Sequence, residues 1–334
     1  MRKILIILLL ALLFLMVPIG GFFWIKDSFA PLSSQEDFQA FLITKGTSAQ
    51  DVADKLEKEG FIKSALAFKI YTQTTGLSRR ILAGEYKLSP HMSLIQIVSE
   101  LTSGPLEVWV TVPEGLRREE VAEKFIEGLS KADEEGATFR QEFLSQSKDK
   151  EGFLFPDTYL FPKEASASAV VSRMRSTFDR RIEEFEGQIA QSELSPPEIV
   201  TLASILERET ITSEERPIVA GILLNRLEIG MGLQADATVQ YAKANIKCQI
   251  SNVKCDWWEP LTKADFAIDS PYNTYKIRGL PPAPIANPGL SSLRAAIKPE
   301  STNYLYYLHD KDGGVHYAST LDEHNENVSK YLNK

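Results

Sequence analysis

The segment Ser195–Thr210 (SPPEIVTLASILERET) most constrains the fold, because it predicts a helix that is apolar on nearly every side. Ser195 suits the N-cap, Pro196 suits the first helical position, and Glu198 completes a capping box. At about 100° per residue, the apolar residues of this helix leave no wide polar face. They are Ile199, Val200, Leu202, Ala203, Ile205 and Leu206. We therefore expect the surrounding domain to pack around this helix.

Glu207 places a carboxyl group on the side of the helix that also carries Ala203 and Ser204, whose small side chains leave room for a ligand. Desolvation there would disfavour the ionised form, which is how a general acid is kept protonated near neutral pH. A Glu near a helix C-terminus is more often exposed or ion-paired, and Arg208 offers a partner. Periodicity also does not choose between Glu207 and Glu209, so the helix alone leaves the catalytic and structural interpretations open.

The N-terminus predicts a membrane anchor. After Arg2 and Lys3, the 22 residues from Ile4 to Ile25 carry no charge. As a helix they would reach roughly 33 Å, enough to cross a bilayer core. A cleaved signal peptide is the alternative, but its apolar region would be shorter. The basic N-terminus favours a cytoplasmic end, so we expect residues 1–30 to form a cytoplasmic tip and transmembrane anchor with the remainder extracytoplasmic.

Charge and cysteine content exclude some classes of function. The formal net charge is −8 and no Lys/Arg run occurs, which argues against a nucleic-acid partner. At 334 residues, two domains are expected. Cys248 and Cys255 have no second cysteine pair and no adjacent His, so the sequence predicts no metal site and makes the pair a candidate structural disulfide.

Residues 38–150 contain a weak internal repeat with an offset of 69 positions. The segment 43–56 recurs as 112–125, and each copy reads as an apolar strand, a Gly turn and an amphipathic helix. Units of this kind resemble LysM domains, the small modules that bind N-acetylglucosamine polymers. A spacer domain without glycan affinity is the alternative, since neither copy shows an aromatic sugar platform.

The second half of the chain has several local signals. Four aromatic residues and two prolines in 151–162 predict a packed cluster, whereas the charged segment 131–150 predicts a loop or a boundary between a helix and a linker. A capping box at Thr212–Glu215 predicts a second helix to about Leu227, and its Gly221 would allow close approach of a neighbour. Residues 303–308 and 315–318 predict a β-hairpin.

Six motifs occur together in order and carry a family resemblance: EGFLFPDTY (151–159), LASILERET (202–210), ERPIVAGILLNRL (215–227), GLQADATVQYA (232–242), SPYNTYKIRGLPPAPIANPG (270–289) and SLRAAIKP (292–299). Together they closely resemble the endolytic murein transglycosylases of the MltG (YceG-like) family, over essentially the whole chain. The resemblance implies an α+β fold with a transmembrane helix, a LysM-like subdomain and a mixed α+β catalytic domain at 151–334.

The resemblance also implies the chemistry. The first Glu of the family's E-x-E-T ending matches Glu207, which makes it the candidate catalytic residue. Lytic transglycosylases use one carboxyl group to protonate the oxygen leaving from N-acetylmuramic acid. The same group then takes the proton of the sugar's C6 hydroxyl as that oxygen attacks C1, which gives a 1,6-anhydro ring without water. No cofactor is implied.

Polar and aromatic groups of two motifs are the candidate substrate-binding residues: Gln234, Asp236, Thr238, Tyr241, Tyr272, Asn273, Thr274 and Tyr275, together with Asn225. Asp236 could instead be a second carboxylate for hydrolysis, or it could cap the helix that follows it. The segment with the cysteines and Trp257–Trp258 departs from the family pattern. Its tryptophans either pack locally or stack on sugar rings.

The expected partners follow from the same resemblance. They are peptidoglycan glycan strands, peptidoglycan synthases (penicillin-binding proteins) and the cell inner membrane, which the chain would cross once. The alternatives are a hydrolytic muramidase and a non-catalytic peptidoglycan-binding scaffold.

Overall fold

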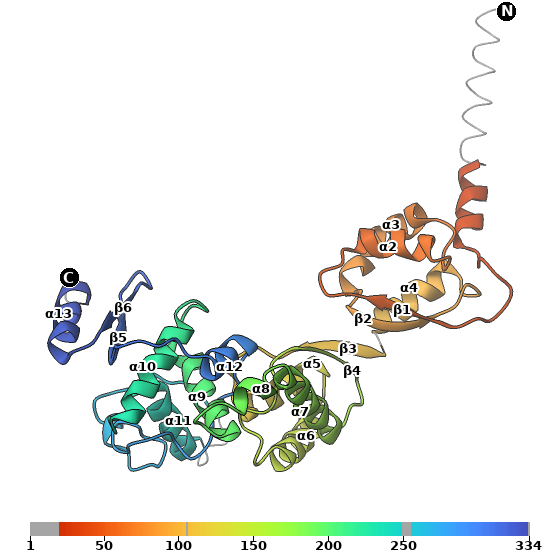
Figure 1. Cartoon of the computed structure of the whole chain (residues 1–334). Coiled ribbons are helices and arrows are strands. Elements are labelled where there is room, and N and C mark those ends of the chain that lie inside the picture. The colour runs from red at the N-terminus through yellow and green to blue at the C-terminus, as the bar shows by residue number, and fades with distance from the viewer. Residues whose placement is uncertain (1–19, 105, 249–254, 333–334) are drawn as a thin grey trace, which may run out of the picture. The chain divides into compact units, whose positions relative to one another are not determined.

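The computed structural model describes residues 20–104, 106–248 and 255–332 and has a mixed α+β structure (Figure 1). Contacts within the chain divide it into two units. The first comprises Met1–Val110 with Tyr159–Glu164, and the second comprises Thr111–Thr158 with Ala165–Lys334. The division therefore does not follow the boundary predicted at residue 150, because residues 111–150 pack with the second unit.

The first unit is built on a four-stranded sheet with the order β1-β2-β3-β4. Strands β1 and β2 are antiparallel and pair Phe41 with Tyr86. Helices α2, α3 and α4 pack with these two strands around one apolar core (Figure 1). The elements are β1 (Gln39–Ile43), α2 (Ala49–Lys58), α3 (Ala65–Thr74), η1 (Leu77–Arg80), β2 (Gly84–Leu88), α4 (Leu94–Ser103), β3 (Glu107–Thr111) and β4 (Thr158–Pro162).

Both copies of the predicted repeat have the expected local structure. In the first copy, β1 leads through Gly46 (φ 88°) to α2. In the second, β3 leads through Gly115 (φ 77°) to α5 (Arg118–Gly128). The positive φ explains why glycine occupies both turns. Only the first copy lies wholly in the first unit, because α5 packs with α6 (Asp133–Gln146) of the second unit.

The second unit is mainly helical and is organised around α9 (Pro196–Glu209). All eight residues from Ile199 to Leu206 are buried. Helices α10, α11 and α12 pack on α9, and each fully buried Leu or Ile there contributes about 1.5–3 kcal/mol. The other elements are α7 (Ala167–Glu183), α8 (Glu186–Ile189), α10 (Arg216–Glu228), α11 (Asp236–Lys247), η2 (Asp265–Ala267), α12 (Leu290–Ile297), β5 (Tyr306–His309), β6 (Val315–Ala318) and α13 (Leu321–Tyr331).

Several local predictions for the second unit are confirmed. The Glu198 carboxylate accepts hydrogen bonds from the Ser195 N–H (2.8 Å) and hydroxyl (2.5 Å), as the capping box requires. A Cβ on Gly221 would lie 2.1 Å from the Glu300 carbonyl oxygen, so this glycine does permit a close approach. The predicted hairpin is present as β5 and β6.

The segment 131–150, expected to be a loop or a boundary between a helix and a linker, contains α6, because burial of Phe139 and Phe143 stabilises a helix whose own sequence is mostly charged. One boundary differs from prediction. Helix α10 begins at Arg216 rather than near Thr212. The Glu215 carboxylate accepts the Thr212 N–H (2.7 Å), so the capping interaction shapes the turn before the helix instead of starting it.

Residues 20–29 are helical, and most of the predicted anchor lies outside the described residues. Among the residues that are described, no helix has the length and apolar character needed to cross a membrane.

Candidate active site

The carboxyl group of Glu207 lies at the C-terminal end of α9, where only 6% of its side chain is exposed. Both of its oxygens are used as acceptors. Oε1 accepts from the Arg216 guanidinium at 2.9 Å, and Oε2 accepts from the Gly289 N–H at 2.9 Å. A charge-assisted bond and a backbone bond together fix the position of this group.

Arg216 is itself held in place. It is the first residue of α10, 11% of its side chain is exposed, and its Nε donates to the Thr210 hydroxyl at 3.2 Å. Thr210 directly follows α9 and its hydroxyl donates to the Leu206 carbonyl at 2.6 Å. The guanidinium therefore joins the end of one helix to the start of the next. Removing one partner of such a buried pair typically costs about 3–5 kcal/mol.

Two loops close over Glu207. The turn 113–116 and the loop around Asn287 exchange backbone hydrogen bonds, from Gly115 N–H to the Asn287 carbonyl and from Asn287 N–H to the Leu116 carbonyl, both at 2.9 Å. A Cβ on Gly115 would lie 3.5 Å from Cγ of Glu207, so the turn lies directly against the catalytic candidate.

Glu114 brings a second carboxyl group to this place. A Cβ on Gly289 would lie 1.9 Å from Glu114 Oε1, so the Glu114 carboxylate is in contact with Gly289. The N–H of the same glycine donates a hydrogen bond to Glu207. Partial burial raises the pKa of Glu114, the negative charge of Glu207 raises it further, and Arg216 opposes both effects. Glu114 is not among the site residues predicted from the sequence, and its signal there is a Glu before the turn glycine of the second repeat copy.

The Asn287 side chain connects the two loops to a third segment. Its amide accepts the Leu154 N–H at 2.9 Å and donates to Leu116 O and to the Glu151 carboxylate, both at 3.0 Å. Glu151 also accepts the Arg118 N–H at 3.1 Å. Burial, and after it the charge of Glu119, raise the pKa of Glu151 to about 8 against the opposing effects of Arg117 and Arg118.

Glu209, the rival to Glu207 on the same helix, faces a different environment. Its carboxylate accepts the Ala237 N–H at 3.2 Å and the Tyr307 hydroxyl at 3.0 Å. Burial raises the pKa of Glu209, and these two bonds oppose the rise. Glu209 thus joins α9 to α11 and β5, which leaves Glu207 as the carboxyl group of α9 beneath the two loops.

Comparisons with known proteins identify the family of the chain. The sequence model of the YceG-like family matches residues 41–330. The chain belongs to the YceG-like family. An endolytic murein transglycosylase of Bacillus subtilis (strain 168) is 32% identical, and the alignment covers 94% of this chain and 90% of that protein.

Two further proteins extend the comparison. An endolytic murein transglycosylase of Streptococcus pneumoniae serotype 2 is 28% identical over 94% of this chain, but the match spans 63% of that longer protein. The crystal structure of a yceG-like protein from Listeria monocytogenes has a TM-score of 0.56 and 30% identity, and the match covers 87% of this chain and 99% of that one.

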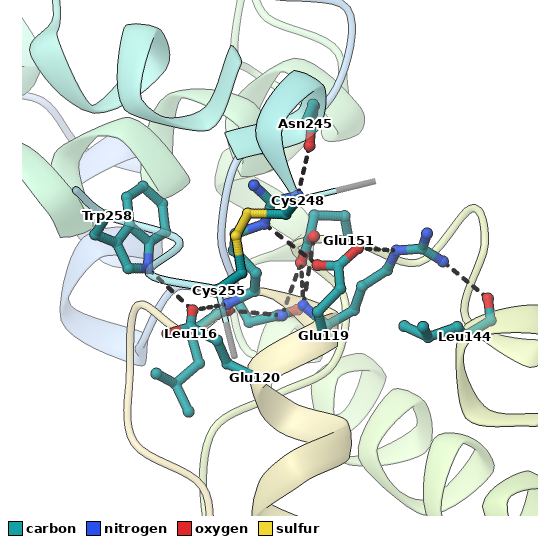
Figure 2. A network of polar contacts seen from close by, with 12 residues as sticks. Leu116, Glu119, Glu120, Leu144, Glu151, Asn245, Cys248, Cys255 and Trp258 are labelled. Atoms are coloured by element: carbon teal, nitrogen blue, oxygen red, sulfur yellow. Dashed lines mark hydrogen bonds and ion pairs between the residues drawn. A yellow bond between two sulfur atoms is a disulfide. The ribbon is translucent and has the colours of Figure 1, made fainter. Parts of the chain in front are cut away.

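The segment that departs from the YceG-like pattern packs beside the site. The candidate disulfide between Cys248 and Cys255 is formed, with 5.7 Å between the two Cα atoms. Figure 2 shows the disulfide together with Trp258, whose indole N–H donates to Glu120 at 2.9 Å. The Arg208 guanidinium lies 3.8 Å from the Trp258 ring centre. These contacts favour local packing over sugar stacking for Trp258.

Arg117 occupies the centre of the same network. Only 2% of its side chain is exposed. Its guanidinium lies 4.0 Å from the ring centre of Tyr241 and 4.5 Å from that of Trp257, and it donates to Asn245 at 2.6 Å. A buried cation between two rings is stabilised by cation–π attraction. Both rings therefore support the protein interior, so Tyr241 and Trp257 act here as packing residues.

Several predicted substrate-binding residues are also internal. The side chains of Thr238, Asn273 and Thr274 are fully buried. Thr238 and Thr274 share a hydrogen bond at 2.8 Å, and the Asn273 amide donates to two backbone carbonyls. Asn225 donates to the carbonyls of residues 302 and 304. The side chains of these four residues brace loops within the protein.

The remaining candidates are accessible. Gln234 and Asp236 are exposed, Tyr275 is 39% exposed, and Tyr272 is half-buried. Gln234 has φ 49°, an uncommon conformation for a residue other than glycine. Asp236 is not the N-cap of α11, which is Ala235. Its carboxylate instead accepts the Tyr275 hydroxyl at 2.6 Å.

Proposed function

We propose that this protein is an endolytic murein transglycosylase in which Glu207 is the catalytic carboxyl group. One observation carries the proposal: in a chain of the YceG-like family, a carboxyl group at the end of the buried helix is fixed by Arg216 and Gly289 beneath two loops. The names of the Bacillus and Streptococcus relatives support the same activity.

The substrate in this proposal is the peptidoglycan glycan strand, cleaved internally at its N-acetylmuramic acid–N-acetylglucosamine bond. A carboxyl group protonates the leaving oxygen, the muramic acid C6 oxygen attacks C1, and a 1,6-anhydro end results. The accessible residues Gln234, Asp236, Tyr272 and Tyr275 are our candidates to hold the strand, since amides, hydroxyls and aromatic faces suit sugar rings.

We further propose that residues 1–30 anchor the protein in the inner membrane, with the rest of the chain extracytoplasmic. The described helical residues Phe22, Phe23 and Trp24 are exposed and continue the apolar run, as interfacial residues do. The strand–turn–helix pattern of residues 38–150 supports a LysM-like, glycan-facing role for that region. Anchoring would confine cleavage to nascent strands near the synthases and so end their elongation.

A hydrolytic muramidase is the main alternative, and it requires a second carboxylate that activates water. The predicted candidate, Asp236, is hydrogen-bonded to Tyr275, and its charge contributes to raising the pKa of Glu209. This placement disfavours hydrolysis through Asp236. A glycan-binding scaffold without activity is the other alternative.

Mass spectrometry of the ends released from purified glycan strands tests the proposal. The full-length protein and Glu207→Gln are compared, with Glu142→Gln as a control because Glu142 is an exposed residue of α6. We expect wild type and the control to produce ends lighter than reducing muramic acid by one water, and Glu207→Gln to produce none. Reducing ends would replace the proposal with hydrolysis, and binding without cleavage would replace it with the scaffold.

A further inference from the structure

Helix α3 presents two large aliphatic side chains to solvent. Leu66 and Ile70 are both exposed, and because they are four residues apart they lie side by side on one face of the helix. The opposite face buries Phe68 and Thr72 in the core of the first unit. A single exposed apolar residue is common in proteins, whereas neighbouring ones that form a continuous surface indicate an interaction site.

The end of the N-terminal apolar run is fixed beside this helix. The run stops at Ile25, two residues before Asp27. The Asp27 carboxylate accepts a hydrogen bond from the Lys63 ammonium at 2.8 Å, and Lys63 lies two residues before α3 begins. The ring of Phe29 meets the ring of Tyr71 in α3 edge to face, with 5.5 Å between the ring centres. The apolar run therefore ends against α3 and not on a free linker.

Leu32 extends the apolar surface. It is exposed, and a Cβ on Gly60 would lie 3.9 Å from its side chain. Gly60 belongs to the loop that leads from α2 to α3. The Leu32 N–H donates to the Pro90 carbonyl at 3.0 Å, which fixes its segment to the unit. We refer to Leu32, Leu66 and Ile70 together as the α3 surface.

We propose, on the basis of the membrane anchor proposed above, that the α3 surface rests on the phospholipid bilayer that holds the anchor. Its aliphatic side chains enter the boundary between the headgroups and the acyl chains, as the apolar face of an interfacial helix does. Lys26 and Lys63 lie among the headgroups, where their ammonium groups attract anionic lipids. The first unit is then held to the membrane by its own surface as well as by the anchor, with α3 toward the bilayer.

The connection to the anchor sets the distance between α3 and the bilayer. An apolar run that ends at Ile25 places this residue at the edge of the hydrocarbon core. Asp27 is helical and lies only about 3 Å further along the helix axis. The Lys63 ammonium that bonds Asp27 is therefore at the level of the headgroups, and α3 begins two residues later. Helix α3 thus starts in the headgroup layer.

The residue types favour lipid over a glycan strand as the occupant. A sugar-binding face needs aromatic rings and hydrogen-bonding groups, whereas all three members of the α3 surface are aliphatic. Aliphatic side chains instead gain free energy by leaving water for an apolar phase. The neighbouring lysines suit anionic headgroups better than the hydroxyl groups of a sugar.

The experiment uses the full-length protein in vesicles of phosphatidylethanolamine and phosphatidylglycerol in equal amounts. A nitrobenzoxadiazole dye is attached to Ile70→Cys or, as a matched control, to Ile229→Cys. Both isoleucines are exposed, at 47% and 61%, and Ile229 belongs to the second unit. The native cysteines are joined in the disulfide and do not react. Lipids with a nitroxide on the upper acyl chain should quench the dye several-fold more at position 70 than at position 229.

A second set of variants separates the α3 surface from the anchor. Leu66→Glu combined with Ile70→Glu replaces two exposed side chains, so we expect the fold and the flotation of the protein with vesicles to be kept. A dye on Leu32→Cys should be quenched by the nitroxide lipid in the otherwise unchanged chain. The double Glu variant should reduce this quenching several-fold, because charged side chains leave the acyl boundary, and Ile229→Glu should leave it unchanged.

The possible failures are distinguishable. Equal quenching at positions 70 and 229, or none at position 70, would overturn the proposal. Protection of position 70 from aqueous iodide without quenching by the lipid would identify a protein, such as a second copy of this chain, as the occupant and would overturn it as well. Failure of the unlabelled wild type to float with vesicles would instead overturn the anchor, and failure to form anhydro ends would overturn the transglycosylase function.

Discussion

Replacement of Glu151 by glutamine should remove a pH dependence from the stability of the second unit. Glu151 is 7% exposed and accepts hydrogen bonds from the Arg118 N–H and the Asn287 amide. Glutamine has nearly the same shape and keeps one acceptor oxygen, but it cannot ionise. The variant therefore separates the charge of this residue from its packing.

The sign follows from the direction of the shift. Burial raises the pKa of Glu151 from 4.5 to about 8 in the folded protein. Between these values the unfolded chain loses the proton that the native protein retains, so the free energy of unfolding falls as the pH rises. From pH 5 to pH 7 the loss amounts to about 3 kcal/mol, because each unit is worth about 1.4 kcal/mol. The contribution is fully present below pH 4.5 and is lost by about pH 8.

Urea unfolding at pH 5, 6 and 7 measures this effect on wild type, Glu151→Gln and the exposed control Glu142→Gln. We expect Glu151→Gln to gain about 3 kcal/mol relative to wild type between pH 5 and pH 7, whatever its stability at pH 5. The control should follow wild type. A difference between Glu151→Gln and wild type that stays constant across this range would show that Glu151 does not titrate as a buried neutral acid.

Three further predictions concern the surroundings of the site. Gly152→Ala should lower the free energy of unfolding by about 2–5 kcal/mol in urea, because its positive φ and the proline and valine atoms that its Cβ would meet within 3 Å both oppose a side chain. Gly230→Ala, with positive φ but open space, should cost only about 1–2 kcal/mol, and equal losses would contradict the packing argument. Asp236→Asn should retain glycan cleavage with anhydro ends, and loss of all cleavage would restore Asp236 as a catalytic candidate. Replacing Cys248 and Cys255 together by serine should cost about 2–3 kcal/mol in urea, as expected for a short closed loop, and an unchanged urea midpoint would contradict this.

Features of the fold that depend on neighbouring residues could be predicted from the sequence. The extent of α9, its capping box and the apolar residues that it buries all follow from signals within one segment. The close approach at Gly221 was also predictable, because a glycine inside a helix signals contact with a neighbour. In contrast, the extent of α6 could not be predicted, because this helix depends on tertiary burial of two phenylalanines within a mostly charged sequence.

The candidate site was less predictable, because its contacts join distant segments. The identity of Glu207 came from the family resemblance, but its partners Arg216 and Gly289 lie on other elements. Residue type alone also could not separate accessible polar residues from internal ones. Thr238 and Thr274 satisfy each other inside the protein, whereas Gln234, in the same motif as Thr238, is exposed.

The internal repeat explains how the second carboxyl group reaches the site. The two copies share a strand, a turn glycine with positive φ and a helix, so their local sequence requirements are the same. They differ in what surrounds the turn: a Cβ on Gly46 would meet no atom within 4 Å, whereas one on Gly115 would contact Glu207 and Arg208. They also differ in the residue before the glycine, which is Lys45 in the first copy and Glu114 in the second. The same structural unit therefore forms a surface turn in one place and presents a carboxyl group to Glu207 in the other. Glu114→Lys should keep the fold of this turn and lower glycan cleavage, because it replaces a carboxylate near Glu207 and Arg216 by an ammonium group, and unchanged cleavage would show that the turn has only a structural role.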